Sequence, residues 1–208
     1  MIRTAILSEN ELNQIHEATL RVLAKTGLKL EHQKIREILF ARGARPGRDN
    51  ETVCLPPSMV KEYLALAPST ARFCGRGARS WETGPGRPSV FWTAAAMNLF
   101  DRQGKHEFDR AELARLSRLV QGLDNLDGVV GVSVKDVPPK FRDVAGFRTM
   151  LENTLKHVRV LSFSPEGTAL IVEMARVALG SESLAARPIF SLGFTAHGPL
   201  RWTNLALD

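Results

Sequence analysis

The residues LDGVVGVSVKDVPPKFRDVAGFRTMLENTLKHVRVLSF, from Leu126 to Phe163, decide the fold class of this chain. They hold two short apolar runs, Val129 to Val134 and Val158 to Phe163, separated by a helical pattern from Pro139 to Leu155. A third apolar run, Ile189 to Phe194, follows another helical segment. Runs bounded in this way by polar or turn residues are typical of buried parallel strands. The order of segments predicts a βαβαβ unit with right-handed connections.

Two architectures contain such a unit, an open doubly wound sheet and the start of a (β/α)8 barrel, and periodicity alone does not choose between them. The turns after the strands are informative about ligands. Val134 is followed by Lys135 and Asp136, and Phe163 is followed by Ser164 and a proline. Neither turn is the glycine-rich loop that holds a dinucleotide pyrophosphate, so the usual dinucleotide signature is missing.

The residues before this unit are mainly helical. Ser8 and Glu11 form a predicted capping box for a first helix, which Gly27 ends. Further helices are predicted from His32 to Arg42, from Pro56 and Pro57 up to Pro68, and from Asp109 to near Gly122, with short strands and a long turn from Thr70 to Asp101. We therefore divide the chain into residues 1–125, a helical extension with a β-hairpin and a capping helix, and residues 126–208, which hold the strand-helix units.

Composition places the chain among ordinary globular proteins. Its 208 residues are 44% hydrophobic and 24% charged, which is enough apolar material for a buried core. No segment has the length of a membrane span, and the first residues lack a signal-peptide pattern, so a cytoplasmic location is expected. Cys54 and Cys74 are far apart and have no histidine at metal-ligand spacing, which argues against a metal site or a disulfide framework.

Four segments, taken in order, resemble the trimethylamine methyltransferase family, which includes proteins that demethylate glycine betaine and other quaternary amines. They read LSENELNQIHEATLRVLAKTGLKLEH, ARGARPGRDNETVCLPPSMVKEYLALAPSTARFCGR, FDRAELARLSRLVQGLDNLDGVVGVSVKDVPPKFRD and RPIFSLGFTAHGPLRW. The resemblance runs from the first helix to the last residue. It implies a (β/α)8 TIM barrel with an N-terminal helical extension, in an enzyme of the methylamine metabolism that accompanies methanogenesis.

The resemblance also implies a reaction. The complete enzyme would transfer a methyl group from trimethylamine, glycine betaine or a similar small methylated amine to the Co(I) centre of a partner corrinoid protein. The corrinoid (cobalamin) would belong to the partner, and this chain would bind no cofactor. A barrel needs about 250 residues, whereas we expect this chain to hold only the first three strands. It would then be inactive alone, with an exposed strand edge that favours aggregation or pairing with a second copy.

The candidate substrate-binding residues follow from the barrel, because ligands meet the carboxyl ends of its strands. Ser133 lies at the end of the first predicted strand and Asp136 follows it, Ser162 and Phe163 end the second, and His197 follows the third. Each of these residues could instead cap a helix or pack under a loop, and no catalytic residue is assigned.

Two aromatic residues are further candidates for the substrate site. Phe91 and Trp92 lie in a short strand before the barrel, where an aromatic face could hold an ammonium group by cation–π attraction. The alternative is that both rings belong to the core.

A second hypothesis is a non-catalytic interaction module. The net charge of +6 and the pI near 9.7 could serve an acidic protein or a nucleic acid. However, the arginines and lysines are interleaved with acidic residues along the chain and form no basic stripe, so nucleic acid is a poor candidate. Binding to random DNA with a steep salt dependence would distinguish this hypothesis from the enzyme.

Overall fold

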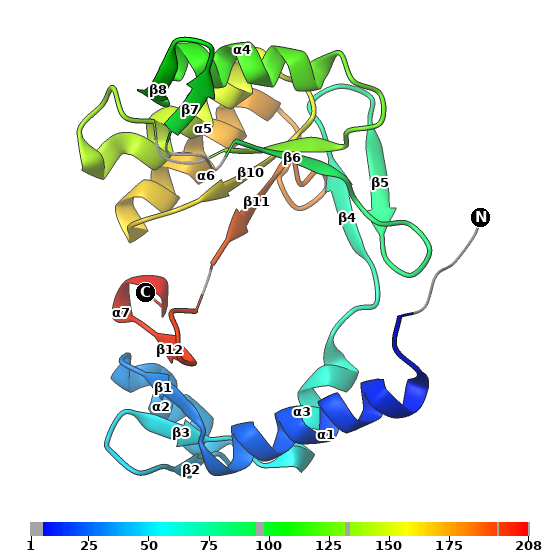
Figure 1. Cartoon of the computed structure of the whole chain (residues 1–208), viewed down its shortest axis with the longest axis vertical. Coiled ribbons are helices and arrows are strands. Elements are labelled where there is room, and N and C mark those ends of the chain that lie inside the picture. Colours follow the sequence, from blue (N-terminus) through cyan, green and yellow to red (C-terminus); the bar gives the residue numbers. More distant parts are fainter. Residues whose placement is uncertain (1–5, 95–97, 132–133, 195, 208) are drawn as a thin grey trace. The chain divides into compact units, whose positions relative to one another are not determined.

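The computed structural model describes residues 6–94, 98–131, 134–194 and 196–207, and the chain divides into two compact units (Figure 1). The first unit combines Met1–Pro68 with Thr195–Asp208, and the second unit is Ser69–Phe194. Each unit has its own sheet and its own buried apolar cluster. The protein therefore belongs to the α/β class, as the sequence predicts.

The first unit is built on a small mixed sheet with the strand order β12-β1-β3-β2. Strand β1 runs parallel to β12 and antiparallel to β3. Its core consists of Leu30, Ala44, Val53 and Met59. The elements of this unit are α1 (Glu9–Lys25), β1 (Leu28–Leu30), α2 (Gln33–Ala41), β2 (Arg45–Pro46), β3 (Thr52–Cys54), α3 (Pro57–Leu66), β12 (Arg201–Trp202) and α7 (Asn204–Leu207).

Both ends of α1 are fixed by residues that the sequence singles out. The Ser8 hydroxyl accepts a hydrogen bond from the Glu11 N–H at 3.3 Å, and the Glu11 carboxylate accepts one from the Ser8 N–H at 2.7 Å. This reciprocal pair is the predicted capping box. Gly27 follows the helix with φ at +76°, and a Cβ there would lie 2.6 Å from the carbonyl oxygen of Val53. Only glycine fits this position, so the predicted helix end is confirmed.

The second unit is built on a parallel sheet with the strand order β11-β10-β9-β6. Helices α4, α5 and α6 lie on one face of this sheet (Figure 1). The strands are β6 (Phe91–Ala94), β9 (Gly128–Gly131), β10 (His157–Leu161) and β11 (Phe190–Gly193). The helices are α4 (Arg110–Gln121), η1 (Pro139–Phe141), α5 (Arg142–Asn153) and α6 (Pro165–Leu179).

The parallel sheet has one strand more than the three that the sequence predicts. The additional strand is β6, which was expected to precede the barrel, and it pairs with β9 in the register Phe91↔Gly128 to Ala94↔Gly131. It was missed because its pairing partner lies beyond a hairpin and a helix, where local pattern carries no information. Since β6 and α4 pack in the same unit as β9, the boundary predicted at residue 125 runs within the second unit.

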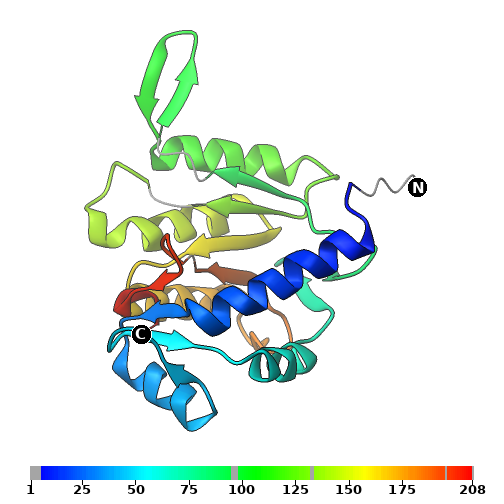
Figure 2. The same ribbon diagram turned by 60° about the horizontal axis from the view of Figure 1, so that its bottom comes forward.

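Two antiparallel hairpins accompany the parallel sheet, where the sequence predicts one. The first joins β4 (Ala71–Cys74) to β5 (Ser80–Thr83), and the second joins β7 (Asn98–Asp101) to β8 (Gly104–Glu107). Figure 2 shows the β7–β8 hairpin projecting beyond α4. Every residue of β8 is exposed, and Phe100 on β7 is also exposed.

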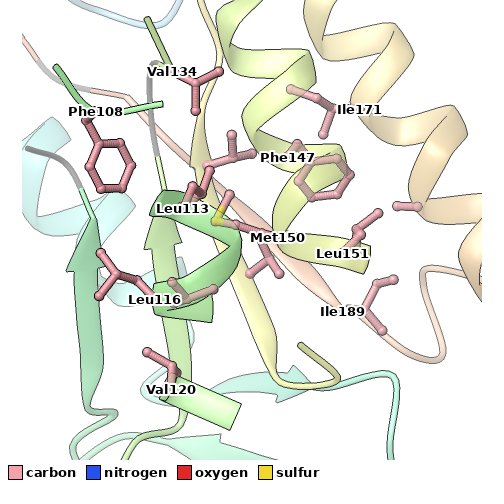
Figure 3. Close-up of a cluster of buried hydrophobic side chains, with 14 of the residues drawn as sticks. Phe108, Leu113, Leu116, Val120, Val134, Phe147, Met150, Leu151, Ile171 and Ile189 are labelled. Atoms are coloured by element: carbon pink, nitrogen blue, oxygen red, sulfur yellow. The ribbon is translucent and has the colours of Figure 1, made fainter. Parts of the chain in front are cut away.

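The core of the second unit lies between the parallel sheet and its three helices. Figure 3 shows side chains of α4 and α5 meeting those of the strands and of α6. Phe147 is fully buried, and the centroid of its ring lies 5.4 Å from that of Phe190 on β11 in an edge-on arrangement. Val158 and Val160 of β10 belong to the same cluster, so the even-numbered side chains of β10 face the helices.

A buried lysine closes the C-terminal end of α4. The Lys156 ammonium donates hydrogen bonds to the carbonyl oxygens of Val120 at 2.7 Å and Leu126 at 2.9 Å, and also to that of Leu123. These carbonyls lie at or just after the helix end, where a cation is stabilising.

Lys156→Met is therefore expected to lower the free energy of unfolding by about 2 kcal/mol, because three carbonyl groups lose their donor. Urea denaturation monitored by tryptophan fluorescence would measure the change. Lys105→Met, at an exposed position on β8, is the matched control and should change stability little. Equal effects of the two substitutions would contradict the capping role.

Candidate functional site

Several polar and aromatic residues of the second unit follow the ends of its parallel strands. We use the term carboxyl rim for the described residues that follow β9, β10 and β11 within this unit: Lys135, Asp136, Ser162, Phe163, Ser164 and Phe194. Asp136, Ser162 and Phe163 of the predicted substrate site are among them. Ser133, which was also predicted, lies outside the described residues.

The loop after β10 is held by a buried carboxylate that sequence reasoning missed. Asp143, in the first turn of α5, accepts a hydrogen bond from the Phe163 N–H at 3.0 Å, and the Ser162 hydroxyl lies 3.4 Å from the same oxygen. Asp143 is only 1% exposed. Thr168 adds a hydrogen bond to the Ser162 oxygen at 2.7 Å. The network fixes the backbone of Phe163, whose side chain remains 42% exposed.

Two rim residues have structural partners. The Ser164 hydroxyl accepts a hydrogen bond from the Gly167 N–H at 2.9 Å, so Ser164 caps α6. Asp136 accepts a hydrogen bond from Arg110 Nε at 2.7 Å and one from the Arg110 N–H at 3.2 Å. Burial acts to raise the pKa of Asp136, but the hydrogen bonds from Arg110 outweigh it, and the pKa lies below its ordinary value. Asp136 therefore ties the loop after β9 to the start of α4.

The two predicted aromatic residues lie elsewhere in the second unit. Phe91 begins β6, at the amino end of the sheet, and its ring lies 5.9 Å from that of His157 and 6.0 Å from that of Phe73. Trp92 packs against the core between sheet and helices. The structure does not bring either ring to the carboxyl rim. This placement favours the core role for both, and their part in substrate binding stays a prediction.

An aromatic cluster fills the amino end of the open face of the sheet, the face opposite the helices. His157 lies at its centre, 1% exposed, with Phe73 and Trp81 of the β4–β5 hairpin against its ring. The His157 ring nitrogens contact the Cys74 carbonyl oxygen at 3.0 Å and the Ser191 hydroxyl at 3.1 Å. Burial lowers the pKa of His157 to about 4, against the opposing effect of hydrogen bonds with backbone carbonyls. This end of the face is thus occupied by side chains.

The carboxyl half of the open face carries an exposed charged residue. Arg159, the middle residue of β10, projects there and is exposed, although β10 has a hydrogen-bonded neighbour on each side. Sequence reasoning treated Val158 to Phe163 as one apolar run and passed over this residue. The sequence does single out Arg159, because it is a charged residue in an otherwise apolar interior strand.

The remaining predicted residue, His197, belongs to the first unit. It is exposed, and its backbone exchanges two hydrogen bonds of 2.8 Å with that of Arg201. Arg201 in turn pairs with Glu31 through its guanidinium, with 2.7 Å from Nε to the carboxylate. His197 therefore sits in a turn that leads into β12.

The residues that the structure describes offer neither a cluster of metal ligands nor a membrane-spanning helix. They contain no group of three or more histidine, cysteine, aspartate or glutamate residues arranged to hold a metal ion. None of the helices within them combines the length and apolarity needed to cross a membrane.

Comparison with known proteins identifies the family. The family model described as "Trimethylamine methyltransferase (MTTB)" matches residues 1–208, the whole chain. The chain belongs to the trimethylamine methyltransferase family. The resemblance drawn from the four sequence segments is thereby confirmed.

Individual relatives agree with the family match. Trimethylamine methyltransferase MttB of Desulfitobacterium hafniense is 30% identical over 206 residues, which cover 97% of this chain and 42% of that protein. MttB1 of Methanosarcina mazei is 26% identical, covering 96% of this chain and 42% of its own length. MttB of Methanosarcina barkeri is 26% identical, with 94% and 41% covered. The chain thus spans about two fifths of the length of these trimethylamine methyltransferases.

Proposed function

We propose that this chain forms the N-terminal part of a cytoplasmic methyltransferase that transfers a methyl group from a methylated amine to the Co(I) corrinoid of a partner protein. Membership of the trimethylamine methyltransferase family supports the reaction class. The observation that carries the proposal is the asymmetry of the open face of the parallel sheet. Its amino end is filled by the His157 cluster, while its carboxyl rim presents exposed groups.

A (β/α)8 barrel is the architecture proposed for the complete fold. The four parallel strands β6, β9, β10 and β11 lie in chain order across the sheet, and helices cover one face of it. In a barrel, that face would be the outside and the open face would be the inside. Among the described residues β11 pairs with β10 alone, so its other edge is available for a fifth strand. Ligands of such barrels bind at the carboxyl rim.

The rim offers aromatic rings suited to an ammonium group. Phe163 follows β10 and Phe194 follows the paired strand β11, and they are 42% and 49% exposed. Sequence reasoning included Phe163 and missed Phe194. A methylated ammonium ion is attracted to aromatic faces by cation–π interaction, and its methyl groups gain from apolar contact. These two rings are therefore the proposed holders of the methyl donor.

The chemical groups of the carboxyl rim also matter for which protein would hold the corrinoid. The described side chains of the rim are hydroxyl, carboxylate, ammonium and aromatic groups, and neither a thiolate nor an imidazole is among them. These groups are suited to binding the methyl donor, and in our proposal the partner protein holds the cobalt. When present, the corrinoid supplies a strong nucleophile for the methyl group. The residues of this chain would bind and orient the ammonium and keep water away from it.

A binding experiment tests the role of Phe163. The chain should bind choline more tightly than 3,3-dimethylbutan-1-ol, its uncharged isostere, when both are titrated by calorimetry. Phe163→Leu should weaken choline binding roughly two- to fivefold, because the ring quadrupole is lost while apolar contact remains, and should leave the isostere unaffected.

Phe100→Leu is the matched control, since Phe100 is an exposed ring on the β7–β8 hairpin, outside the rim. It should bind choline like the unchanged protein. Equal affinity for choline and the isostere, or equal effects of the two phenylalanine substitutions, would count against an ammonium site at the rim.

A further inference from the structure

Helix α1 turns its apolar stripe toward solvent. Leu12, Ile15 and Val22 recur at helical spacing, and such a stripe normally faces the core of its own domain. Here these side chains are 53%, 54% and 43% exposed. Within α1, which the structure describes throughout, Leu20 is the one buried residue. Thr19 is also exposed and lies between Ile15 and Val22 on the same side of the helix, and we use the term α1 stripe for Leu12, Ile15, Thr19 and Val22.

The spacing of the α1 stripe is that of a coiled-coil seam. Its members follow one another at intervals of three, four and three residues, the pattern by which two helices pack along their length. The helix has 17 residues and is therefore about 25 Å long. An apolar seam that the described part of its own chain leaves open is typical of an interaction surface.

The stripe is accessible over both halves of α1. Residues 9–17 are all exposed, and Figure 2 shows this end of the helix extending beyond α3. The C-terminal half is anchored to its own unit, since Leu20 is buried and the Leu23 carbonyl oxygen accepts a hydrogen bond from the Leu55 N–H at 2.9 Å. The two stripe residues of this half are nevertheless exposed. A helix can therefore be accommodated along the whole stripe.

The charges of α1 indicate which helix that is. Its first turn is acidic, with Glu9 and Glu11, and its last turn is basic, with Lys25. Two parallel copies would bring equal charges together, whereas two antiparallel copies bring the acidic end of each against the basic end of the other. An antiparallel pair has a twofold axis, so each contact is made twice. Charge complementarity thus favours a second copy of α1 as the occupant of the stripe.

The spacing of the stripe also sets the register of the pair. When the twofold axis is level with Glu17, Leu12 of one copy lies against Val22 of the other, and Ile15 lies against Thr19. The axis repeats both layers, so all four stripe residues of each copy are covered. This register leaves no stripe residue facing solvent.

The same register brings Lys25 of one copy level with Glu11 of the other. These two residues are two heptads apart in the sequence, so both lie on the same flank of the stripe. A carboxylate accepts several hydrogen bonds, and Glu11 can therefore keep its capping contact with Ser8 while it pairs with a lysine. The dimer would contain this ion pair twice.

We propose that the α1 stripe is a dimer interface, at which two copies of this chain pair through antiparallel α1 helices. The inference goes beyond the proposed function and does not depend on methyl transfer. It also differs from pairing through the free edge of β11, because α1 belongs to the first unit and β11 to the second. A single helix pair is a small interface, so a dissociation constant in the micromolar range is expected.

Sedimentation equilibrium of the full chain measures this pairing. Ile15→Glu should weaken dimerisation roughly tenfold or more, because the interface would bury an unpaired charge. Ile15 is exposed within a single chain, so the variant should fold, which circular dichroism would verify. Ile38→Glu is the matched control, since Ile38 is an exposed isoleucine on α2 of the same unit, and it should leave the equilibrium unchanged.

A charge reversal tests the orientation. Lys25→Glu should weaken dimerisation roughly fivefold or more, because two attractive contacts become repulsive. Arg21→Glu makes the same change of charge one turn earlier, at a position that faces away from the stripe, and should have a smaller effect.

Crosslinking tests the register. His16 and Glu9 are one heptad apart and lie on the same flank of the stripe. The antiparallel register places the two copies of His16 next to the twofold axis, so bis-maleimidoethane should link His16→Cys chains into dimers. The two copies of Glu9 would be roughly 20 Å apart along the helices, so Glu9→Cys chains should stay unlinked. Both native cysteines are buried and should not react.

Each outcome decides for or against the interface. A loss of dimer in Ile15→Glu and Lys25→Glu, with Ile38→Glu unchanged, supports it. A chain that remains monomeric at roughly 100 μM overturns the inference. A dimer that survives both Ile15→Glu and Lys25→Glu also overturns it, because the copies must then pair through another surface such as the β11 edge. Linkage of Glu9→Cys chains without linkage of His16→Cys chains contradicts the antiparallel pairing.

Discussion

Phe147→Ala is expected to lower the free energy of unfolding of the second unit by roughly 3–5 kcal/mol. Phe147 of α5 is fully buried in the apolar cluster that Figure 3 shows. Its ring packs edge-on against that of Phe190. Truncation removes the transfer free energy of the ring and leaves a cavity that helices fixed at both ends can fill only partly. Urea denaturation monitored by the fluorescence of Trp81 and Trp92, both in this unit, would measure the change.

Phe141→Ala provides the comparison. Phe141 ends η1, immediately before α5, and is 45% exposed, with the Lys140 ammonium 4.7 Å from its ring centroid. Its truncation removes little buried area and a weak cation–π contact, so a loss below about 1 kcal/mol is expected. If the Phe147→Ala protein is as stable as the Phe141→Ala protein, the burial of Phe147 in the core is contradicted.

The helices could be predicted from sequence because their signals are local. Ser8 and Glu11 are three residues apart, and so are Asp109 and Glu112, where the Asp109 carboxylate accepts a hydrogen bond from the Glu112 N–H at the start of α4. Such caps satisfy backbone donors within a single turn, whatever the rest of the chain does. Gly27 is equally local, because its positive φ is required at the end of α1 itself.

Strand pairing could not be predicted in the same way. Phe91 to Ala94 is a short segment after a glycine- and proline-rich turn, and nothing in those residues states that they pair with 128–131. That information depends on the packing of α4 across both strands, which is a tertiary property. The sequence therefore identified the parallel order of β9, β10 and β11 and assigned β6 to the wrong part of the fold.

The carboxyl rim was predictable in location but not in detail. Knowing that loops follow strand ends was sufficient to select Ser162 and Phe163. It was not sufficient to find Asp143, because an acid in the first turn of a helix is usually read as a surface residue that interacts with the helix dipole. Its burial depends on how the loop after β10 folds back over α5. Similarly, only the folded chain reveals which residues surround Arg159 on the open face of the sheet.

Acidification should destabilise the second unit through His157. The pKa of this histidine falls from its ordinary value of 6.5 to about 4 in the folded chain, mainly because burial disfavours the charged imidazolium. The folded pKa is below the unfolded one, so the unfolded chain takes up the proton first as the pH falls. The associated stability is complete above pH 6.5 and is lost between pH 6.5 and 4.

The size of this loss of stability follows from the linkage between proton binding and folding. The difference between the folded and unfolded pKa of His157 corresponds to about 3 kcal/mol of folding stability in total. Of this, about 2 kcal/mol should be lost between pH 7.5 and pH 5. Urea denaturation at a series of pH values, with Trp81 fluorescence as the probe, measures this slope directly, because Trp81 packs 6.1 Å from the imidazole. An NMR titration of the His157 ring should show a midpoint near 4.

Two histidine variants isolate this contribution from that of the carboxyl groups, which also titrate in acid. His157→Gln keeps hydrogen-bonding capacity toward Cys74 and Ser191 but has no proton to gain, so its stability should vary less between pH 7.5 and pH 5. His106→Gln, at an exposed position on β8, should retain the full slope. If His157 titrates near 6.5, water reaches its ring, and the aromatic cluster does not close the amino end of the open face. A midpoint near 4 together with the lost slope would establish that closure, which leaves the carboxyl rim as the entrance for a ligand.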